Sequence, residues 1–500
     1  MVPSGLSPFC FIAAVVIRYV CPETSRPIAG WGEEDLPMWR GISTPSVRLG
    51  VGAGAVIAAA WMATCLPSVV LAEPAERLRL FIETDAGGDP DDEQSLVRFL
   101  VSANEWDVEG IACTCPETRR GENLNPAPNG LAIVQRMLDA YAECWPRLKE
   151  HASFPEPDIL RLVTVDGTDA SDAAVALLVA AVDRDDPRPL WFSNWGTDDG
   201  TTSCLRRALD KVLRERGPEG YAAFKSRLRL CSDDRFGPHT REITPAWPIW
   251  VYTKLPDMDG GRWYHRFGPL TATAGGFDLE RDVRTGHGSL GALYPTNTTI
   301  PQKEGDTPEF LYLLPNGLGD PEEPSWGSWA GRFGAMPDAD GRPYFAPNVR
   351  DTREGVAHRD HTLDRWAADL QNDFSARMDW CVLPFADANH PPQVRLRGSG
   401  RPSVQPGGSV ALDVSESSDP DGDALHTTWV VYPEPGSSRG APAVIEGADR
   451  ASAVLHVPDT AMPGTIHCIA VVRDDGEPKL TRYARVVVAV TPTDRSAREP

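Results

Sequence analysis

The sequence predicts an α/β domain with a mostly parallel sheet, followed by an all-β sandwich. Two patterns indicate this fold class. Apolar β-rich runs alternate with amphipathic helical runs over the first part of the chain, and only short β-rich runs follow a stiff polar linker. The chain has 500 residues, which is too many for one ordinary core, so two or three domains are expected.

The first domain is predicted over residues 73–385 from its alternating patterns. Its expected strands are 78–82, 189–195, 228–231 and 249–252, and its expected helices are 93–103, 173–182 and 203–216. In the first of these helices Leu96, Val97 and Leu100 share one face. Such alternation implies a parallel sheet covered on both faces, and these sheets bind ligands at the carboxyl ends of their strands.

The second domain is predicted over residues 393–493, after a linker at 386–392. Beyond the linker the helical pattern stops. Turns rich in Gly, Pro and Asp separate five expected strands, at 409–414, 427–432, 453–457, 466–472 and 484–490. This spacing is typical of a β-sandwich of about a hundred residues.

The N-terminal region predicts export. We interpret residues 1–37 as an extension upstream of the natural start at Met38. Residues 38–72 show the pattern of a signal peptide, with Arg40 and Arg48, an apolar run, and small residues before Glu73. We therefore expect a secreted or periplasmic protein, with association with the cell surface left open. The alternative is an uncleaved anchor, because the apolar run approaches the length of a membrane span, whereas no segment after residue 72 does.

Composition excludes some partners and some site types. The chain is 41% hydrophobic and 24% charged, with a formal net charge of −22. So acidic a chain lacks the clustered Lys and Arg that binding to nucleic acid requires, but it is compatible with bound cations and neutral sugars. The cysteines after residue 72 have irregular spacings. We expect buried thiols, leave one or two disulfides open, and assign no metal to cysteine.

An acidic loop follows the first expected strand. Asp85, Asp89, Asp91 and Asp92 lie within eight residues, with two glycines between them. Carboxylates this close raise one another's pKa unless a cation lies among them. Oxygen ligands in a Gly-containing loop suit Ca²⁺ better than zinc or copper. The alternative is an ordinary solvated start of a helix.

Longer motifs give the loop a family context. They are the segment 82–92, Arg188–Trp191 with Trp195-Gly196, the segments 286–295 and 304–308, Phe310–Leu318, and Trp326–Trp329. Together they resemble the nucleoside hydrolase superfamily, and most closely its bacterial branch named for a cellulose-binding protein. The resemblance runs from about residue 77 to the C-terminus. It implies a nucleoside hydrolase-like α/β domain followed by an immunoglobulin-like β-sandwich.

The resemblance also implies a catalytic metal site. Asp85 is implied to bind Ca²⁺ and to act as general base toward the attacking water. Asp92 is implied as a second ligand, with Asp91 as the near alternative, and Glu83 as the residue that orients the site. The metal would hold the sugar hydroxyls and the water together. A backbone carbonyl from the loop 195–201 would complete the coordination sphere.

The last metal ligand of the family is an Asp that opens a late helix. Asp306 fits, because Thr307-Pro308 begins an apolar helical run, and Asp320, also followed by Pro, is the alternative. Two departures separate this chain from the family pattern. Glu83 replaces the usual first Asp, and Gly88-Asp89-Pro90 lengthens the loop, so the metal geometry of the family does not transfer directly.

Glu83, Asp89, Asn316 and Trp326 are candidates for substrate binding, and His287 is a catalytic candidate. Asp89 belongs to the acidic loop, and His287, between two glycines, is a candidate proton donor to the leaving group, with a turn histidine as the alternative. Asn316, expected within the apolar helical run, would bind a sugar or cap a loop. Trp326 would stack on a sugar or pack between domains. Residues that contact the base in nucleoside-specific enzymes have no clear counterpart, so the substrate stays open.

The sandwich contains a second acidic motif. Asp419-Pro420-Asp421-Gly422-Asp423 resembles a turn of immunoglobulin-like modules that sometimes binds Ca²⁺, and Asp474-Asp475-Gly476 is the matching turn near the last strand. The alternative is two Asp-rich turns without a metal.

These observations predict an exported, Ca²⁺-dependent hydrolase of a glycosyl or N-glycosyl bond. Its expected ligand is a small-molecule or polysaccharide sugar, with no nucleic acid polymer as partner, no membrane span after signal cleavage, and the oligomeric state left open. The first alternative is a carbohydrate-binding protein of the cellulose-binding type, with an inactive hydrolase-like pocket. The second is a structural cell-surface protein that uses calcium only for rigidity.

Overall fold

The computed structural model describes residues 76–118, 127–196, 201–232, 239, 243–253, 266–298, 300–337 and 343–492. The expected extension 1–37 and signal peptide 38–72 lie outside these residues, as do residues 197–200 of the loop expected to supply a backbone carbonyl to the metal. Among the described helices, none combines the length and the apolar character that crossing a bilayer requires.

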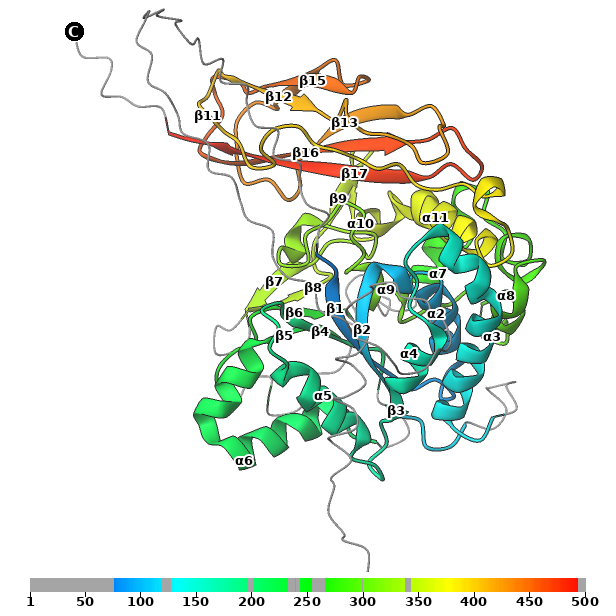
Figure 1. Cartoon of the computed structure of the whole chain (residues 1–500). Helices are drawn as coiled ribbons and strands as arrows, with labels where there is room; N and C mark the ends of the chain where they lie inside the picture. Colours follow the sequence, from blue (N-terminus) through cyan, green and yellow to red (C-terminus); the bar gives the residue numbers. More distant parts are fainter. Residues whose placement is uncertain are drawn as a thin grey trace, which may run out of the picture. The chain divides into compact units, whose positions relative to one another are not determined.

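A mostly parallel sheet forms the centre of the first domain, as the alternating pattern predicts (Figure 1). Among the described residues its strand order is β3-β2-β1-β4-β5-β6-β8-β7, and β7 is antiparallel to β8. The strands are β1 Leu78–Thr84, β2 Trp106–Cys113, β3 Thr164–Asp166, β4 Leu190–Asn194, β5 Leu228–Ser232, β6 Trp250–Tyr252, β7 Gly334–Pro337 and β8 Pro343–Ala346. The order reverses at β1, which pairs with β2 on one side and β4 on the other. Open α/β sheets bind ligands at such a switch point.

Helices cover both faces of this sheet. They are α2 Pro90–Leu100, α3 Gly130–His151, α4 Pro157–Leu162, α5 Ala173–Asp183, α6 Cys204–Ser226, α7 Phe267–Thr271, α8 Gly288–Leu293, α9 Thr307–Leu311, α10 His361–Asp364 and α11 Ala367–Asp379. Alternate side chains of β1 enter two cores. Leu80 and Ile82 pack in the core that includes α2, α3, α9 and α11, whereas Phe81 packs in the core that includes α5 and α6.

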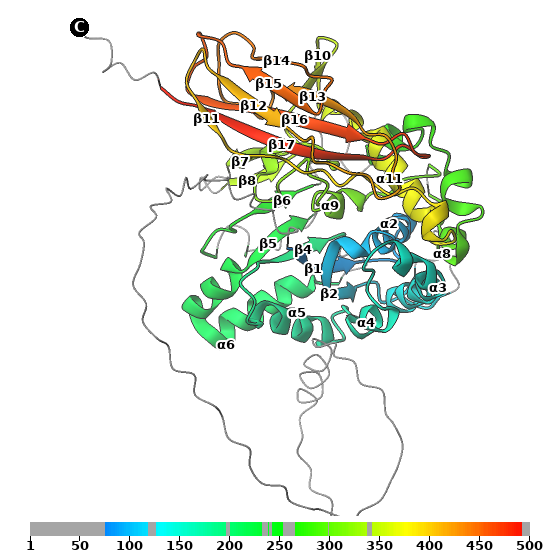
Figure 2. The ribbon, with the colours of Figure 1, turned by 45° about the horizontal axis from the view of Figure 1, so that its top comes forward.

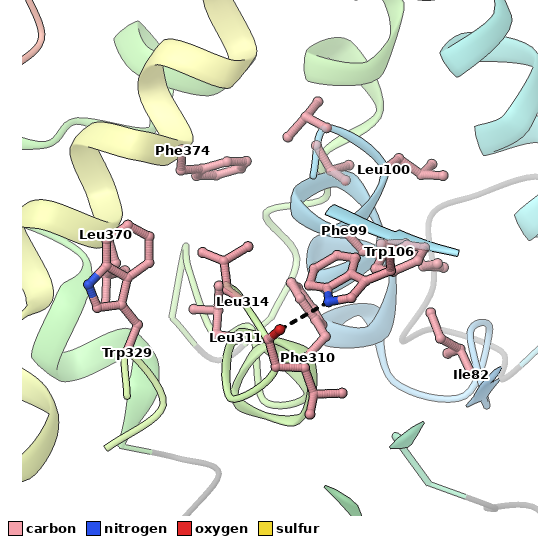
Figure 3. Packing of buried hydrophobic residues seen from close by; sticks show 14 of the residues in the cluster. Ile82, Phe99, Leu100, Trp106, Phe310, Leu311, Leu314, Trp329, Leu370 and Phe374 are labelled. Atoms are coloured by element: carbon pink, nitrogen blue, oxygen red, sulfur yellow. Dashed lines mark hydrogen bonds between the residues drawn. The ribbon is translucent and has the colours of Figure 1, made fainter. Parts of the chain in front are cut away.

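Aromatic rings fill the first of these cores (Figure 3). Phe99 of α2 stacks on Trp106 of β2 at 5.6 Å between ring centroids, and Phe310 of α9 meets both rings edge-on. The Trp106 indole donates to the Leu313 carbonyl at 3.1 Å, so its only polar atom is satisfied inside the core. These contacts hold α9 against α2 and the sheet.

The second domain consists of two packed sheets, as its spacing predicts (Figure 2). In the described residues their orders are β11-β17-β16-β13 and β12-β15-β14. The strands are β11 Ser403–Val404, β12 Ser409–Asp413, β13 His426–Tyr432, β14 Val444–Glu446, β15 Ser452–His456, β16 Gly464–Arg473 and β17 Thr481–Val490. A separate hairpin, β9 Asp351–Arg353 and β10 Val356–His358, precedes α10.

Two buried carboxylates of the first domain accept hydrogen bonds from tyrosines of the sandwich. Tyr483 of β17 donates to Asp369 Oδ2 at 2.7 Å, and Tyr432 of β13 donates to Asp351 Oδ2 at 2.5 Å. Arg332 also pairs with Asp351 at 2.8 Å. Charge-assisted bonds inside the interface therefore join the sandwich to the α/β domain.

Two local expectations differ from the structure. The helix expected at 203–216 is longer in the structure, where α6 continues to Ser226. A kink interrupts α6 at Gly217, because this residue adopts a positive φ of 68°. The apolar run that follows Asp306 is helical only to Leu311, so the expectation of Asn316 inside a helix is wrong. Pro315 precedes Asn316 and cannot donate the hydrogen bond that a continuing helix needs. The seven described cysteines are buried thiols.

A buried ion pair fastens the segment before α9 to α2. Arg98 and Glu304 form two hydrogen bonds, at 2.6 and 3.1 Å, and Tyr294 donates to Glu304 Oε1 at 2.8 Å. The Arg98 guanidinium also lies 3.8 Å from the Phe374 ring centroid. Gln94 Oε1 accepts from the backbone amides of Lys303 and Glu304 at 2.8 and 2.9 Å. This network fixes the chain immediately before Asp306.

Replacement of Arg98 by Met is expected to destabilise the protein strongly. Glu304 would remain buried without its cation, which typically costs about 3–5 kcal/mol of the free energy of unfolding. The measurement is urea denaturation followed by far-UV circular dichroism. Arg161→Met is the matched control, since Arg161 pairs with exposed Asp139 and Asp158 and should cost less than about 1 kcal/mol. Equal losses in both variants would contradict the role assigned to the buried pair.

Candidate functional site

The acidic loop lies at the carboxyl end of β1, at the switch point of the sheet. Asp85 follows the strand directly, and the Gly88 amide donates to the Asp85 carbonyl at 2.8 Å to close a turn. Gly87 has a φ of 97°, which disfavours a side chain there. Pro90 begins α2, so the acidic residues of the loop surround the positive end of the helix dipole.

Three carboxylates converge beside this helix start. Asp91 and Asp92 come from the first turn of α2, and Asp306 precedes α9. Each offers one oxygen, and these oxygens lie within 4.8 Å of one another, with all three residues buried. Oxygens that share a Ca²⁺ at about 2.3–2.6 Å can lie at most about 5 Å apart. The donor set therefore fits a hard divalent cation.

The negative charges of the cluster act together on Asp92. Burial, followed by the negative charges of Asp306, Asp85 and Asp91, raises the pKa of Asp92 well above its ordinary value. The Thr84 hydroxyl donates to Asp92 Oδ1. A carboxylate in these surroundings is stabilised in its charged form by a nearby cation.

Asp85 interacts with Asp92 of this cluster, and the residue that follows β4 approaches the Asp85 carboxylate closely. Gly196 follows β4 with a φ of 134°, and a Cβ at this position would lie 3.1 Å from Asp85 Oδ1. A side chain at position 196 would therefore press on the Asp85 carboxylate.

Lys303 brings a cation into the acidic loop. The residue is 6% exposed, and its ammonium group pairs with Asp89 and lies 3.1 Å from Asp91 Oδ2. Burial acts to lower the pKa of Lys303, but the carboxylates of Asp91 and Asp89 outweigh burial and raise it above its ordinary value. Sequence reasoning missed Lys303. The signal available was a lysine three residues before the expected ligand Asp306.

Glu83 connects three elements beneath the loop. Its carboxylate accepts hydrogen bonds from the Asn194 side chain and the Ser203 hydroxyl at 2.6 Å each, and from the Cys204 amide at 2.5 Å. Burial raises the pKa of Glu83, while the bonds from Ser203 and Cys204 oppose the rise. Glu83 thus holds β1, β4 and the start of α6 in register.

His287 lies at the start of α8. Its Nε2 is 3.0 Å from Asp379 Oδ1, at the end of α11, and α8 packs against α3. Nδ1 is buried and has no hydrogen-bond partner among the described residues.

The other expected site residues contact the sandwich. The Asn316 carbonyl accepts from the Tyr483 amide at 2.9 Å, and Trp326 meets the His467 ring edge-on at 5.1 Å. The Trp329 indole donates to the Tyr483 hydroxyl at 3.2 Å. Asp320 lies in a turn where it accepts from the Glu322 amide at 3.0 Å. The structure thus brings Asp306, and not Asp320, to the other carboxylates.

Comparisons with known proteins agree with this architecture. The family described as "Cellulose-binding Sde182, nucleoside hydrolase-like domain" matches residues 79–333, and "Cellulose-binding protein Sde0182, C-terminal domain" matches residues 409–490. A solved nucleoside hydrolase-related hypothetical protein from Saccharophagus degradans, associated by its description with carbohydrate metabolism, is 32% identical. That match covers 83% of this chain and 100% of that chain with a TM-score of 0.67.

A second solved structure matches a small part of this chain. The solution structure of the PKD domain from the KIAA 1837 protein is 21% identical over 20% of this chain and 91% of that chain, with a TM-score of 0.15. The search of curated proteins returned no match.

Because the first family covers about half of the chain and the Saccharophagus protein is similar over most of it, this chain belongs to the Sde182 family, with a nucleoside hydrolase-like domain and the C-terminal domain of that family.

Proposed function

We propose that this protein is a Ca²⁺-dependent hydrolase that cleaves a glycosyl or N-glycosyl bond. The observation that carries the proposal is the convergence of the buried Asp91, Asp92 and Asp306 carboxylates at the switch point of a nucleoside hydrolase-like domain. Asp85, which raises the pKa of Asp92 through its charge, adds a fourth carboxylate. Oxygen ligands of this kind favour Ca²⁺ over softer metals.

The proposed roles follow from the positions of the side chains. Asp91, Asp92, Asp306 and Asp85 hold the cation, which when bound supplies positive charge for the sugar hydroxyls and the attacking water. Asp85 Oδ1 or Oδ2 accepts the proton of the water, whose oxygen forms the new bond to the anomeric carbon as the bond to the leaving group breaks. The leaving group is proposed to take its proton from solvent, because His287 pairs with Asp379 beside Cys144, about 20 Å along α3 from the end that contacts the acidic loop.

The substrate is proposed to be a sugar, either small or part of a polysaccharide. The cellulose-binding description of the family and the carbohydrate association of the Saccharophagus protein support this class. Asp89 contributes to sugar binding beside Lys303, and Glu83 orients the loop. Asn316 and Trp326 are assigned to structural roles instead. The Asn316 side chain caps its own turn by accepting from the Leu318 amide at 3.0 Å, and Trp326 packs on His467 of the sandwich.

We also propose that the chain is exported. The pattern at 38–72 supports a signal peptide, and cleavage would leave domains at 73–385 and 393–493 joined by the linker 386–392.

One observation favours the rival function, a sugar-binding protein without turnover. Lys303 already pairs with Asp89 and Asp91, so part of the negative charge available to a metal is neutralised within the chain. The family description names binding rather than cleavage.

Calcium titration of the full chain by calorimetry tests the metal site. Asp92→Asn and Asp306→Asn should each weaken the affinity of one Ca²⁺ site at least about tenfold, since even changes behind a metal ligand typically cost about 10–100-fold. Asp320→Asn is the matched control and should leave the affinity unchanged. Binding that neither Asp92→Asn nor Asp306→Asn alters would refute the proposed metal site.

Removal of the Lys303 charge should strengthen calcium binding. In Lys303→Met the ammonium group no longer competes for Asp91, and the affinity should rise about tenfold, because one unit charge several Å away contributes at least about 1.4 kcal/mol at a protein-like dielectric. Lys303→Arg keeps the charge and should bind calcium as the wild type does. Unchanged or weaker binding in Lys303→Met, in a folded protein, would show that Lys303 does not compete with the cation.

Turnover separates the hydrolase from the binding protein. The wild type is assayed with p-nitrophenyl ribosides, purine and pyrimidine ribosides, and cello-oligosaccharides, with sugar binding followed in parallel by calorimetry. The proposal expects turnover of at least one probe and a loss of about 10²–10⁴-fold in kcat for Asp85→Asn, as is typical for a general base. Saturable sugar binding without turnover in the wild type would favour the rival function.

A further inference from the structure

Two cysteines that lie far apart in the sequence meet inside the α/β domain. Cys144 belongs to α3, and Cys381 lies two residues after the end of α11. Their thiols form a hydrogen bond with one another, and both residues are buried. Gly288, at the start of α8, covers the pair, since a Cβ at this position would lie 3.1 Å from Cys144 Sγ and 3.9 Å from Cys381 Cβ. The two side chains therefore share one space beneath α8.

Contacts on both sides of Cys381 hold its segment against α3. The Trp380 ring stacks on the His151 ring of α3, at 5.3 Å between centroids and 6° between planes. The Leu383 carbonyl lies 3.0 Å from Nε2 of the same histidine. The approach of Cys381 to α3 is thus set by neighbouring side chains as well as by the thiols. A disulfide needs sulfurs that can approach to about 2.05 Å, and hydrogen-bonded thiols already lie in contact.

The two thiols differ in acidity. The hydrogen bond from Cys381, opposed by burial and aided by the Leu290 and Ser289 amides, lowers the pKa of Cys144 to about 7. The same hydrogen bond, together with burial, raises the pKa of Cys381. Thiolates are the attacking species in thiol–disulfide exchange, and the best attacking thiol has a pKa near the ambient pH. At neutral pH Cys144 is therefore the attacking thiol of the pair.

We propose that Cys144 and Cys381 form a disulfide when the chain folds in the presence of a disulfide oxidant. The Cys144 thiolate attacks one sulfur of the oxidant, and a mixed disulfide forms as the first oxidant thiolate leaves. Cys381 then loses its proton, attacks Cys144 Sγ and releases the second oxidant thiolate. The two protons of the cysteines end on the two released thiols. Both protein sulfurs are oxidised, and one oxidant disulfide is reduced.

The bond joins α3 to the segment that leads into the linker 386–392. Its two ends are more than two hundred residues apart in the sequence, so it strongly restricts the unfolded chain. Exported chains meet disulfide oxidants, which connects this inference with the proposed export. The inference is independent of the proposed hydrolase function, and its test needs neither export nor turnover.

Refolding of the full chain with glutathione tests the pairing. The chain is unfolded in urea with dithiothreitol and refolded with a mixture of reduced and oxidised glutathione. Its remaining thiols are then blocked, and the chain is digested. Mass spectrometry should find the peptides of Cys144 and Cys381 joined, whereas refolding in dithiothreitol should leave them separate. Absence of the joined peptides, or predominant pairing of either cysteine with another, would overturn the proposal.

Thermal unfolding gives a second readout. The oxidised chain should have a Tm about 3 °C or more above that of the same chain in dithiothreitol. Cys144→Ala should abolish this difference, and each variant is compared only with its own reduced form, so a general loss of stability does not affect the result. Cys468→Ala removes a buried thiol of the sandwich and is the matched control, which should keep the difference. A difference that persists in Cys144→Ala would rule the pair out.

Discussion

The ion pair between Arg98 and Glu304 determines where the acidic site can form. Arg98 lies about two turns along α2 from Asp91 and Asp92, and Glu304 lies two residues before Asp306. Because both charges are buried, they can be satisfied only when the segment 302–306 lies against α2. Gln94 adds two hydrogen bonds to the backbone of the same segment. The pair therefore brings carboxylates more than two hundred residues apart in the sequence into one cluster.

The fold class could be predicted because its signals are local. The alternation of β1, α2, α5, β4, α6 and β5 is visible in short windows, and the strands of the sandwich lie between evident turns. The end of α9 was harder to foresee, because an apolar run that fills a core has no period that distinguishes a helix from an irregular segment. The last two strands of the sheet, β8 and β7, and the hairpin of β9 and β10 also lack a strong local pattern.

The residues of the candidate site could likewise be predicted only where they lie close together in the sequence. Asp85, Asp91 and Asp92 could be named from one contiguous motif, since eight residues contain all three. The choice between Asp306 and Asp320 required the tertiary structure, because each precedes a proline-containing turn in the sequence. Lys303 was missed for a related reason. Its charge matters only because the Gln94 and Glu304 contacts aim it at Asp89 and Asp91. Trp326 and Asn316 carry the chemistry of a sugar site, and only the position of β17 shows that they pack against the sandwich.

The tyrosines at the domain interface have an evolutionary consequence. Asp369 and Asp351 are buried acids of the α/β domain, and each accepts a hydrogen bond from a tyrosine of the sandwich. Without the sandwich Asp351 would keep Arg332 and Arg365 of its own domain. Asp369 would lose all the side-chain partners described for it, which are Arg473, Thr481 and Tyr483, and a buried acid without partners is costly. Exchange of the sandwich for an unrelated module is therefore disfavoured, and the two domains are expected to be inherited together.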